Sequence, residues 1–110
     1  MKGSNLGEFE ELVLLTIGAL ADDAYGVSIK DFIEARAKRK PSIGALHSAL
    51  SRLEDKGYIK TEIGEATNVR GGRRKKFYHL TIAGKEALRT SKELRTEIYG
   101  MIPNLNFALA

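Results

Sequence analysis

The hydrophobic pattern of the chain changes from a helical to an alternating period at Gly57, and this change limits the folds that 110 residues can adopt. Before Gly57, apolar residues recur at the three- and four-residue spacing of amphipathic helices. After it, residues 58–63 alternate between apolar and polar in the manner of a half-buried strand, and residues 75–80 form a second β run. A polar loop that contains Gly71 and Gly72 joins the two runs, so the sequence predicts a β-hairpin.

Helices are predicted on both sides of this hairpin, three before it and one after it. Pro41 disfavours helix at the preceding residue and so separates the second helix from the third. Ser42 is a good N-cap for the third helix and Gly57 ends it, while Thr81 can cap the last helix. The order helix, helix, helix, strand, strand, helix is an α+β fold that is mostly α. The expected helices span residues 7–20, 25–36, 42–56 and 82–100.

The first of these helices is apolar around most of its circumference. Its main stripe has helical spacing and consists of Phe9, Leu12, Val13, Thr16, Ile17 and Leu20. Leu14 and Leu15 extend this surface almost all the way round. A short chain buries only a limited core, so such a helix needs cover on more than one side. The domain core supplies part of that cover, and a second subunit is one source of the rest.

Composition and the placement of charge limit the classes of function that the chain can have. The chain has no cysteine, which excludes disulfides and thiolate metal sites, and we expect no cofactor and no metal. Its N-terminal residues do not form a signal peptide, and the longest apolar stretch, residues 12–21, is too short to span a bilayer, so a cytoplasmic location is expected.

The net charge is +4 and the pI about 9.4, with four basic residues among 36–40 and five among 70–76. Two such patches are typical of a protein that binds a polyanion, although each could be a solvated loop.

The third helix has an outer face suited to DNA. By their spacing, the residues expected to face the core are Ile43, Leu46, Leu50 and Leu53. The opposite side then carries Gly44, Ala45, Ser48, Ser51, Arg52 and Asp55. Small side chains let a helix enter a major groove roughly 12 Å wide, where serine and arginine reach base edges or phosphates. The alternative is an ordinary surface helix that is rich in serine.

The predicted hairpin concentrates positive charge at its tip. Its basic residues are Arg70, Arg73, Arg74, Lys75 and Lys76. Like charges this close repel one another, and a polyanion offsets that cost by releasing its condensed counterions on binding. A three-helix unit followed by a basic hairpin is the layout of winged helix-turn-helix proteins, in which one helix enters the major groove and the hairpin contacts the backbone or the adjacent minor groove. We therefore expect double-stranded DNA as the partner.

Six stretches of the chain form a recognisable set of motifs: residues 6–15, 23–27, 42–46, 50–57, 71–75 and 80–84. In order and spacing they resemble the PadR family of bacterial transcriptional regulators. The resemblance implies a winged helix-turn-helix domain over residues 1–81 and a dimerisation helix with a tail over residues 82–110, packed as one compact unit. It also implies a homodimeric, cytoplasmic repressor of the family's short type that binds a roughly palindromic operator. A small-molecule effector at the dimer interface is a further partner that the resemblance suggests.

The residue patterns and the resemblance together give the candidate site residues. DNA contacts are expected from Lys38, Arg39, Lys40, Ser42, Gly44, Ala45, His47, Ser48, Ser51, Arg52, Arg70, Arg73, Arg74, Lys75 and Lys76. Dimer contacts are expected from Phe9, Leu12, Leu14, Leu15, Ala87, Leu94, Ile98, Met101 and Ile102, although the stripe on the last helix could instead close the domain's own core. The family usually has tyrosine where this chain has His47, so the contact made there is open.

Three other functions compete with DNA binding. An enzyme is not expected, because His47 and His79 lie on different elements and the chain has no nucleophile motif or phosphate-binding loop, which leaves His79 as a half-buried structural residue. RNA binding would require exposed aromatic side chains near the basic segment, for which Phe77 and Tyr78 are the candidates. The third alternative is a protein-interaction module that keeps the fold but does not bind DNA. Only a binding measurement distinguishes it from a DNA-binding protein.

Overall fold

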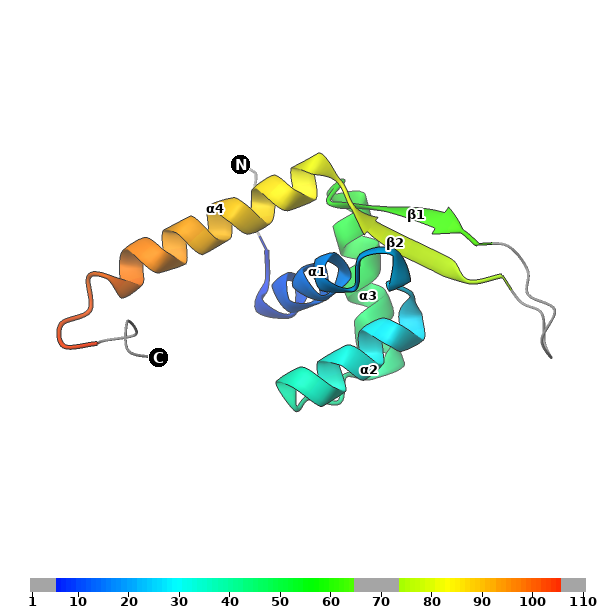
Figure 1. The fold of residues 1–110 in the computed structure, drawn as a ribbon, viewed down its shortest axis with the longest axis horizontal. Helices are drawn as coiled ribbons and strands as arrows, with labels where there is room; N and C mark the ends of the chain where they lie inside the picture. Colours follow the sequence, from blue (N-terminus) through cyan, green and yellow to red (C-terminus); the bar gives the residue numbers. More distant parts are fainter. Residues whose placement is uncertain (1–5, 65–73, 106–110) are drawn as a thin grey trace.

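The predicted order of elements is the observed one. The computed structural model describes residues 6–64 and 74–105. Its helices are α1 (Glu8–Leu20), the short 3-10 helix η1 (Ala21–Asp23), α2 (Gly26–Ala37), α3 (Ile43–Asp55) and α4 (Ile82–Tyr99), and its strands are β1 (Ile59–Ile63) and β2 (Lys76–Leu80) (Figure 1). The fold class is confirmed, and the helix boundaries lie within a residue of those expected from the sequence.

Helix α1 lies at the centre of the fold and packs against α2, α3, β2 and α4 (Figure 1). This arrangement explains why its sequence is apolar on nearly every side. Thr16, the polar member of its stripe, is also buried, and its hydroxyl is satisfied there by donating to the Leu12 carbonyl at 2.9 Å. The core consists of Val13, Leu14, Ile17, Ala24, Ile29, Ile33, Leu46, Ala49, Leu50, Leu53, Tyr58, Ile59, Tyr78 and Ala87.

The caps that the sequence predicted are present. The Ser42 side chain accepts from the Ala45 N–H at 3.0 Å, and the Thr81 side chain accepts from the Gly84 N–H at 3.0 Å. Gly57 has a φ of +78°, a left-handed conformation that favours glycine and lets the chain turn out of α3 into β1. Each serine or threonine cap contributes about 1 kcal/mol to stability.

The two strands form an antiparallel hairpin that is attached to the helices at its base. Their register pairs Ile59 with Leu80 and Ile63 with Lys76. The Tyr78 N–H donates to the Ala24 carbonyl at 2.8 Å, which joins β2 to the turn between η1 and α2. The hairpin therefore extends away from the helices from a fixed starting point (Figure 1).

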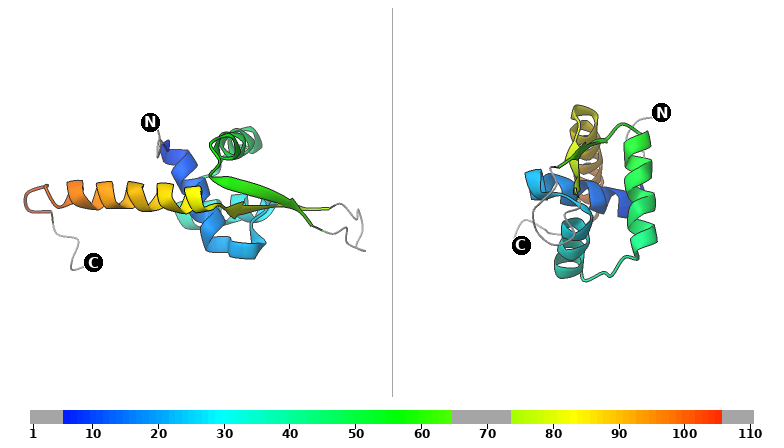
Figure 2. Two further views of the ribbon diagram at one scale, coloured as in Figure 1. Left: turned by 90° about the horizontal axis from the view of Figure 1, so that it is seen from above. Right: turned by 90° about the vertical axis from the view of Figure 1, so that its right-hand side faces the viewer.

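Helix α4 leaves the body on the side opposite to the hairpin, so the molecule is elongated, with extents of 57 × 31 × 23 Å (Figures 1 and 2). Its start is anchored on the turn after α3, where the Thr81 hydroxyl donates to the Gly57 carbonyl at 2.6 Å. Beyond Leu88, every residue of α4 except Ser91 is exposed. None of the helices among the described residues is long and apolar enough to cross a lipid bilayer.

Ile43 is a correction to the predicted core. It is 56 % exposed, although its spacing from Leu46 suggested a place in the apolar stripe. The buried stripe of α3 begins one turn later, at Leu46, and includes Ala49. Ile43 lies in the first turn of α3, ahead of the residues that pack against the body, so it remains at the surface.

Leu14 and Ala87 correct the predicted dimer surface. Both are buried inside the chain itself, at 0 % and 4 % exposure, and have no area left to offer to a partner. Leu14 is covered because α1 is enclosed on several sides, and Ala87 because it lies in the part of α4 that packs against the body. The helical stripes were identified correctly, but their innermost members belong to the domain's own core.

Candidate nucleic-acid interface

The outer face of α3 is exposed as predicted. Gly44, Ala45, His47, Ser48, Ser51 and Arg52 are all at the surface. Among the described residues, the side chains of His47, Ser48 and Ser51 have no hydrogen-bond partner, so their polar groups are available to a ligand. The serine and histidine side chains of this face are therefore free of side-chain hydrogen bonds within the described chain, whereas Arg52 forms an ion pair with Glu10.

The N-terminus of α3 adds backbone donors to this face. The Ser42 oxygen accepts from Ala45 and the Ser42 carbonyl accepts from Leu46, which leaves the N–H groups of Ile43 and Gly44 without partners in the part of the chain that the structure describes. Free N–H groups at a helix N-terminus favour an anion such as a phosphate oxygen. Ser42 acts here as a cap, with its hydroxyl hydrogen still able to be donated.

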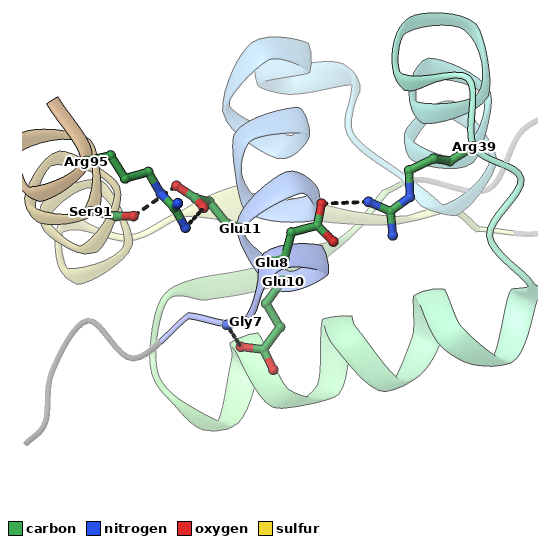
Figure 3. Close-up of polar contacts among 7 residues, drawn as sticks. All are labelled: Gly7, Glu8, Glu10, Glu11, Arg39, Ser91 and Arg95. Atoms are coloured by element: carbon green, nitrogen blue, oxygen red, sulfur yellow. Dashed lines mark hydrogen bonds and ion pairs between the residues drawn. The ribbon is translucent and has the colours of Figure 1, made fainter. Parts of the chain in front are cut away.

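The first basic segment lies in the connection from α2 to α3. Lys38 is the C-cap of α2, with a left-handed φ of +56°, and Lys38 and Lys40 are exposed. Arg39 is already engaged, since its Nη1 lies 2.6 Å from Glu8 Oε2 and its guanidinium lies 5.2 Å from the centre of the Phe9 ring (Figure 3). Arg39 would have to exchange or share these contacts to reach a phosphate.

The second basic segment is only partly described. Arg70 and Arg73 lie outside the described residues. Arg74, Lys75 and Lys76 are exposed at the start of β2. The Lys75 ammonium lies 4.1 Å from the centre of the Tyr25 ring, a cation–π contact that places this charge beside the N-cap residue of α2.

A cluster that the sequence reasoning missed is formed by three acids in the first turn of α1. Each points to a different element: Glu8 to Arg39 before α3, Glu10 to α3 itself, and Glu11 to α4 (Figure 3). Glu11 Oε1 lies 2.9 Å from Arg95 Nη2, and Glu11 Oε2 accepts from the Ser91 hydroxyl at 2.9 Å. The signal was present in the sequence, because Glu10 stands three and four residues before the buried Val13 and Leu14 and so shares their face.

Glu10 is the central member of this cluster and is buried, at 8 % exposure. Its carboxylate accepts from Arg52 Nε at 2.6 Å and from Lys56 Nζ at 2.7 Å. Burial by itself would raise the pKa of Glu10, but the hydrogen bonds from Lys56 and Arg52 outweigh it, so the pKa lies below the ordinary value. Glu10 is therefore ionised at neutral pH and ties α1 to the last turns of α3.

An apolar surface lies on α4 and the adjacent side of α1. Of the residues predicted to contact a second subunit, Leu15, Leu94, Ile98, Met101 and Ile102 are exposed, and Phe9 and Leu12 are half-buried against the core. A groove of about 560 Å³ runs between α1 and α4 and includes Leu15, Leu88 and Tyr99 in its lining. Exposed apolar patches of this kind mark interaction surfaces.

The residues that would support the rival functions are occupied otherwise. Tyr78 is buried, and Phe77 packs edge-on against Tyr25, with ring centres 5.6 Å apart, so neither stands free to stack on a base. His79 is half-buried and its Nε2 lies 3.0 Å from Glu62 Oε1 on the neighbouring strand, as expected of a structural residue.

A three-helix unit with an exposed outer face on its third helix, followed by an antiparallel hairpin, defines a winged helix-turn-helix protein. The model of the transcriptional regulator PadR-like family matches residues 13–90. The chain belongs to this family of transcriptional regulators, as the sequence motifs indicated. It is a DNA-binding transcriptional regulator and not an enzyme.

Solved structures of similar proteins agree with this assignment. A PadR family transcription regulator from Clostridium difficile is 25 % identical, with a TM-score of 0.66 over 84 % of this chain and 96 % of that chain. A protein from Streptococcus mutans is 31 % identical, with a TM-score of 0.62 over 82 % of this chain and 78 % of that chain. A transcriptional regulator from Clostridium thermocellum shares the fold at 24 % identity, with a TM-score of 0.68 over 84 % and 86 % of the two chains. A comparison with curated protein sequences gave no match.

Proposed function

We propose that this regulator is a repressor that binds a roughly palindromic operator as a homodimer. In this proposal α3 enters the major groove, and the basic hairpin, residues 70–76, contacts the backbone or the minor groove. The observation that carries it is the outer face of α3, which is exposed over its whole length and includes Ser48 and Ser51, whose hydroxyls have no partner in the described chain. Such a face fits a major groove roughly 12 Å wide.

The placement of positive charge supports the same orientation. Lys38 and Lys40 stand at the N-terminal end of α3, and Arg74 and Lys76 stand on the hairpin. A helix that lies in a groove has a phosphate backbone on either side of it, so cations are useful at its borders and small groups at its centre. We expect these cations to contact phosphates and Ser48 and Ser51 to face base edges.

The homodimer is supported by the apolar surface that α4 leaves uncovered. Leu94 and Ile98 are half-exposed on a part of α4 that has little of its own chain to pack against, and Leu15 of α1 lines the groove beside it. A second copy of the same surface would cover these side chains in a two-fold arrangement. Two copies of α3 would then lie about one DNA turn, roughly 34 Å, apart. In this proposal residues 1–81 read DNA and residues 82–110 hold the dimer together.

The proposal extends to where the protein acts and what controls it. A regulator of this kind works on cytoplasmic DNA. The groove between α1 and α4 borders the proposed dimer interface, so a small-molecule effector bound there would contact both subunits. A candidate effector should release the parent protein from its operator. The same compound should leave the weaker DNA binding of the Leu94→Glu variant unchanged, and this difference would support an effector site at the dimer interface.

Selection of bound duplexes from a random pool tests the proposed function. The expected result is a motif with two inverted half-sites centred one helical turn apart, and a reporter placed behind that motif should be expressed less when the protein is present. A motif with a single half-site would contradict the two-fold dimer. Enrichment of no sequence over the starting pool would contradict specific recognition, and increased reporter expression would contradict repression.

A further inference from the structure

Glu10 is the buried carboxylate among the described residues. The groups that satisfy it are not the ones that the start of a helix would supply by itself. A buried acid at a helix start could have been satisfied by backbone N–H groups. Here the backbone contributes only Gly7 N–H, at 3.4 Å, and the short contacts come from two cations, Arg52 in α3 and Lys56 at its C-cap. The carboxylate is thus directed at the helix that we propose to read DNA.

The way in which Arg52 is held differs from the other ion-paired arginines of the described residues. Arg39 and Arg95 use a terminal amine, and Arg89 uses both of its terminal amines. Arg52 is held through Nε, at 2.6 Å. Its two terminal amines have no partner within the described chain, and its side chain is 54 % exposed despite the ion pair.

Helical spacing indicates which part of DNA these amines meet. Arg52 follows Ser48 by four residues, which turns it about 40° around α3 from Ser48 toward the side that faces α1. It therefore stands at the border of the outer face, where a helix in the major groove passes the sugar–phosphate backbone. Two parallel N–H donors match the geometry of a phosphate.

We propose that Glu10 is a positioning residue for DNA binding, which holds Arg52 by its Nε so that both terminal amines are presented to one backbone phosphate beside α3. The proposal rests on the proposed function, because it requires α3 in the groove. A guanidinium that is already fixed loses less side-chain freedom when it binds, so the buried acid increases affinity for DNA without touching it.

The charge of Glu10 makes its removal a decisive test, because an effect of net charge and an effect of positioning Arg52 would change the affinity for DNA in opposite directions. By charge alone, Glu10→Gln removes a negative charge and should strengthen binding to a polyanion. By positioning, it releases Arg52 and should weaken binding. Glu34→Gln is the matched control: it makes the same change in charge and breaks a pair of 2.5 Å with Lys30, on α2.

Affinity for one duplex of mixed sequence is measured against salt for the full chain and its variants. We expect Glu34→Gln to bind as tightly as the parent or slightly more tightly. Glu10→Gln should bind roughly tenfold more weakly, the size of a lost charge-assisted contact. Its salt slope should fall by about 1 per subunit, as expected for a lost phosphate contact.

Arg52→Lys provides a second variant that leaves the buried carboxylate partnered, so the test does not depend on the folding of Glu10→Gln. Lysine can keep the ion pair but cannot offer a separate pair of amines, and we expect the same loss. The double variant should bind no more weakly than Arg52→Lys alone. A Glu10→Gln variant as tight as Glu34→Gln, an Arg52→Lys variant as tight as the parent, or additive losses in the double variant would overturn the proposal. A parent protein that binds no duplex at low salt would overturn the proposed function instead.

Discussion

A Cβ atom at Gly84 would lie 2.1 Å from the carbonyl oxygen of Tyr58, so α4 begins in direct contact with the turn that follows α3. Only glycine permits this approach, which is fixed further by the Thr81 N–H donating to the same Tyr58 carbonyl at 3.1 Å. The direction of α4 is thereby linked to the end of α3. In a dimer held by α4, this contact would help to set the separation of the two DNA-reading helices.

Gly84→Ala should therefore destabilise the fold, because the new methyl group cannot be accommodated without moving α4. We expect a loss of about 2–3 kcal/mol in the free energy of unfolding, in the range of overpacked sites, measured by chemical denaturation. Gly26→Ala is the control, since a Cβ there meets nothing within 4 Å. Equal stability of the two variants would show that α4 is not seated as described.

Acid should destabilise the protein in part through Glu10. The pKa of this carboxyl in the folded state lies below its ordinary value of 4.5, because the hydrogen bonds from Lys56 and Arg52 outweigh burial. A lowered folded-state pKa contributes stability that is present above the unfolded-state pKa and is lost as the pH falls through the folded-state pKa. The free energy of unfolding should thus fall between about pH 5 and pH 3 less steeply for Glu10→Gln than for the parent. Parallel pH profiles would contradict the ion pairs seen at Glu10.

A charged residue on the exposed face of α4 should separate the proposed dimer. Leu94→Glu or Ile98→Glu is expected to give monomers or unfolded protein by sedimentation at micromolar concentration, where the parent is a dimer. Ile82→Glu is the control, because Ile82 is also exposed on α4 but lies about 120° around the helix from Leu94. A parent that sediments as a monomer, or a Leu94→Glu variant that stays dimeric, would contradict this interface.

The basic hairpin should contribute affinity without specificity. Arg73→Ala combined with Arg74→Ala should weaken binding to all duplexes and reduce the dependence of affinity on salt, by about 1 in slope for each lost phosphate contact. The control removes two cations that lie on other elements, Lys30 on α2 and Lys85 on α4, and should change both quantities less. Unchanged affinity and slope in the hairpin variant would show that its charges are only solvated.

The fold was predictable from local signals. Ser42, Gly57 and Thr81 define element ends by backbone chemistry that acts within a few residues, and the structure confirms each of them. The change of period at Gly57 likewise reflects how side chains repeat along helices and strands, which requires no knowledge of the partner elements.

What the sequence did not predict depends on contacts between distant segments. Ile43 and Leu46 look equivalent in a periodic pattern, and only the packing of α3 against the body separates an exposed residue from a buried one. Glu10 and Arg52 are 42 residues apart, so their ion pair follows from the crossing of α1 and α3. Leu14 and Leu15 are adjacent leucines, of which one is buried in the core and the other is exposed.

The central claim, that the outer face of α3 reads DNA sequence, is tested most directly at Ser48. Ser48 is exposed near the middle of that face and has no hydrogen-bond partner among the described residues. The measurement is competition between operator and scrambled duplexes for the parent and for Ser48→Leu, at one fixed salt concentration. A bulky apolar side chain should block close approach to the base edges, so we predict that Ser48→Leu loses preference for the operator and keeps the weak, salt-dependent binding to both duplexes. A Ser48→Leu protein that discriminates as well as the parent would show that another face of α3 lies in the groove.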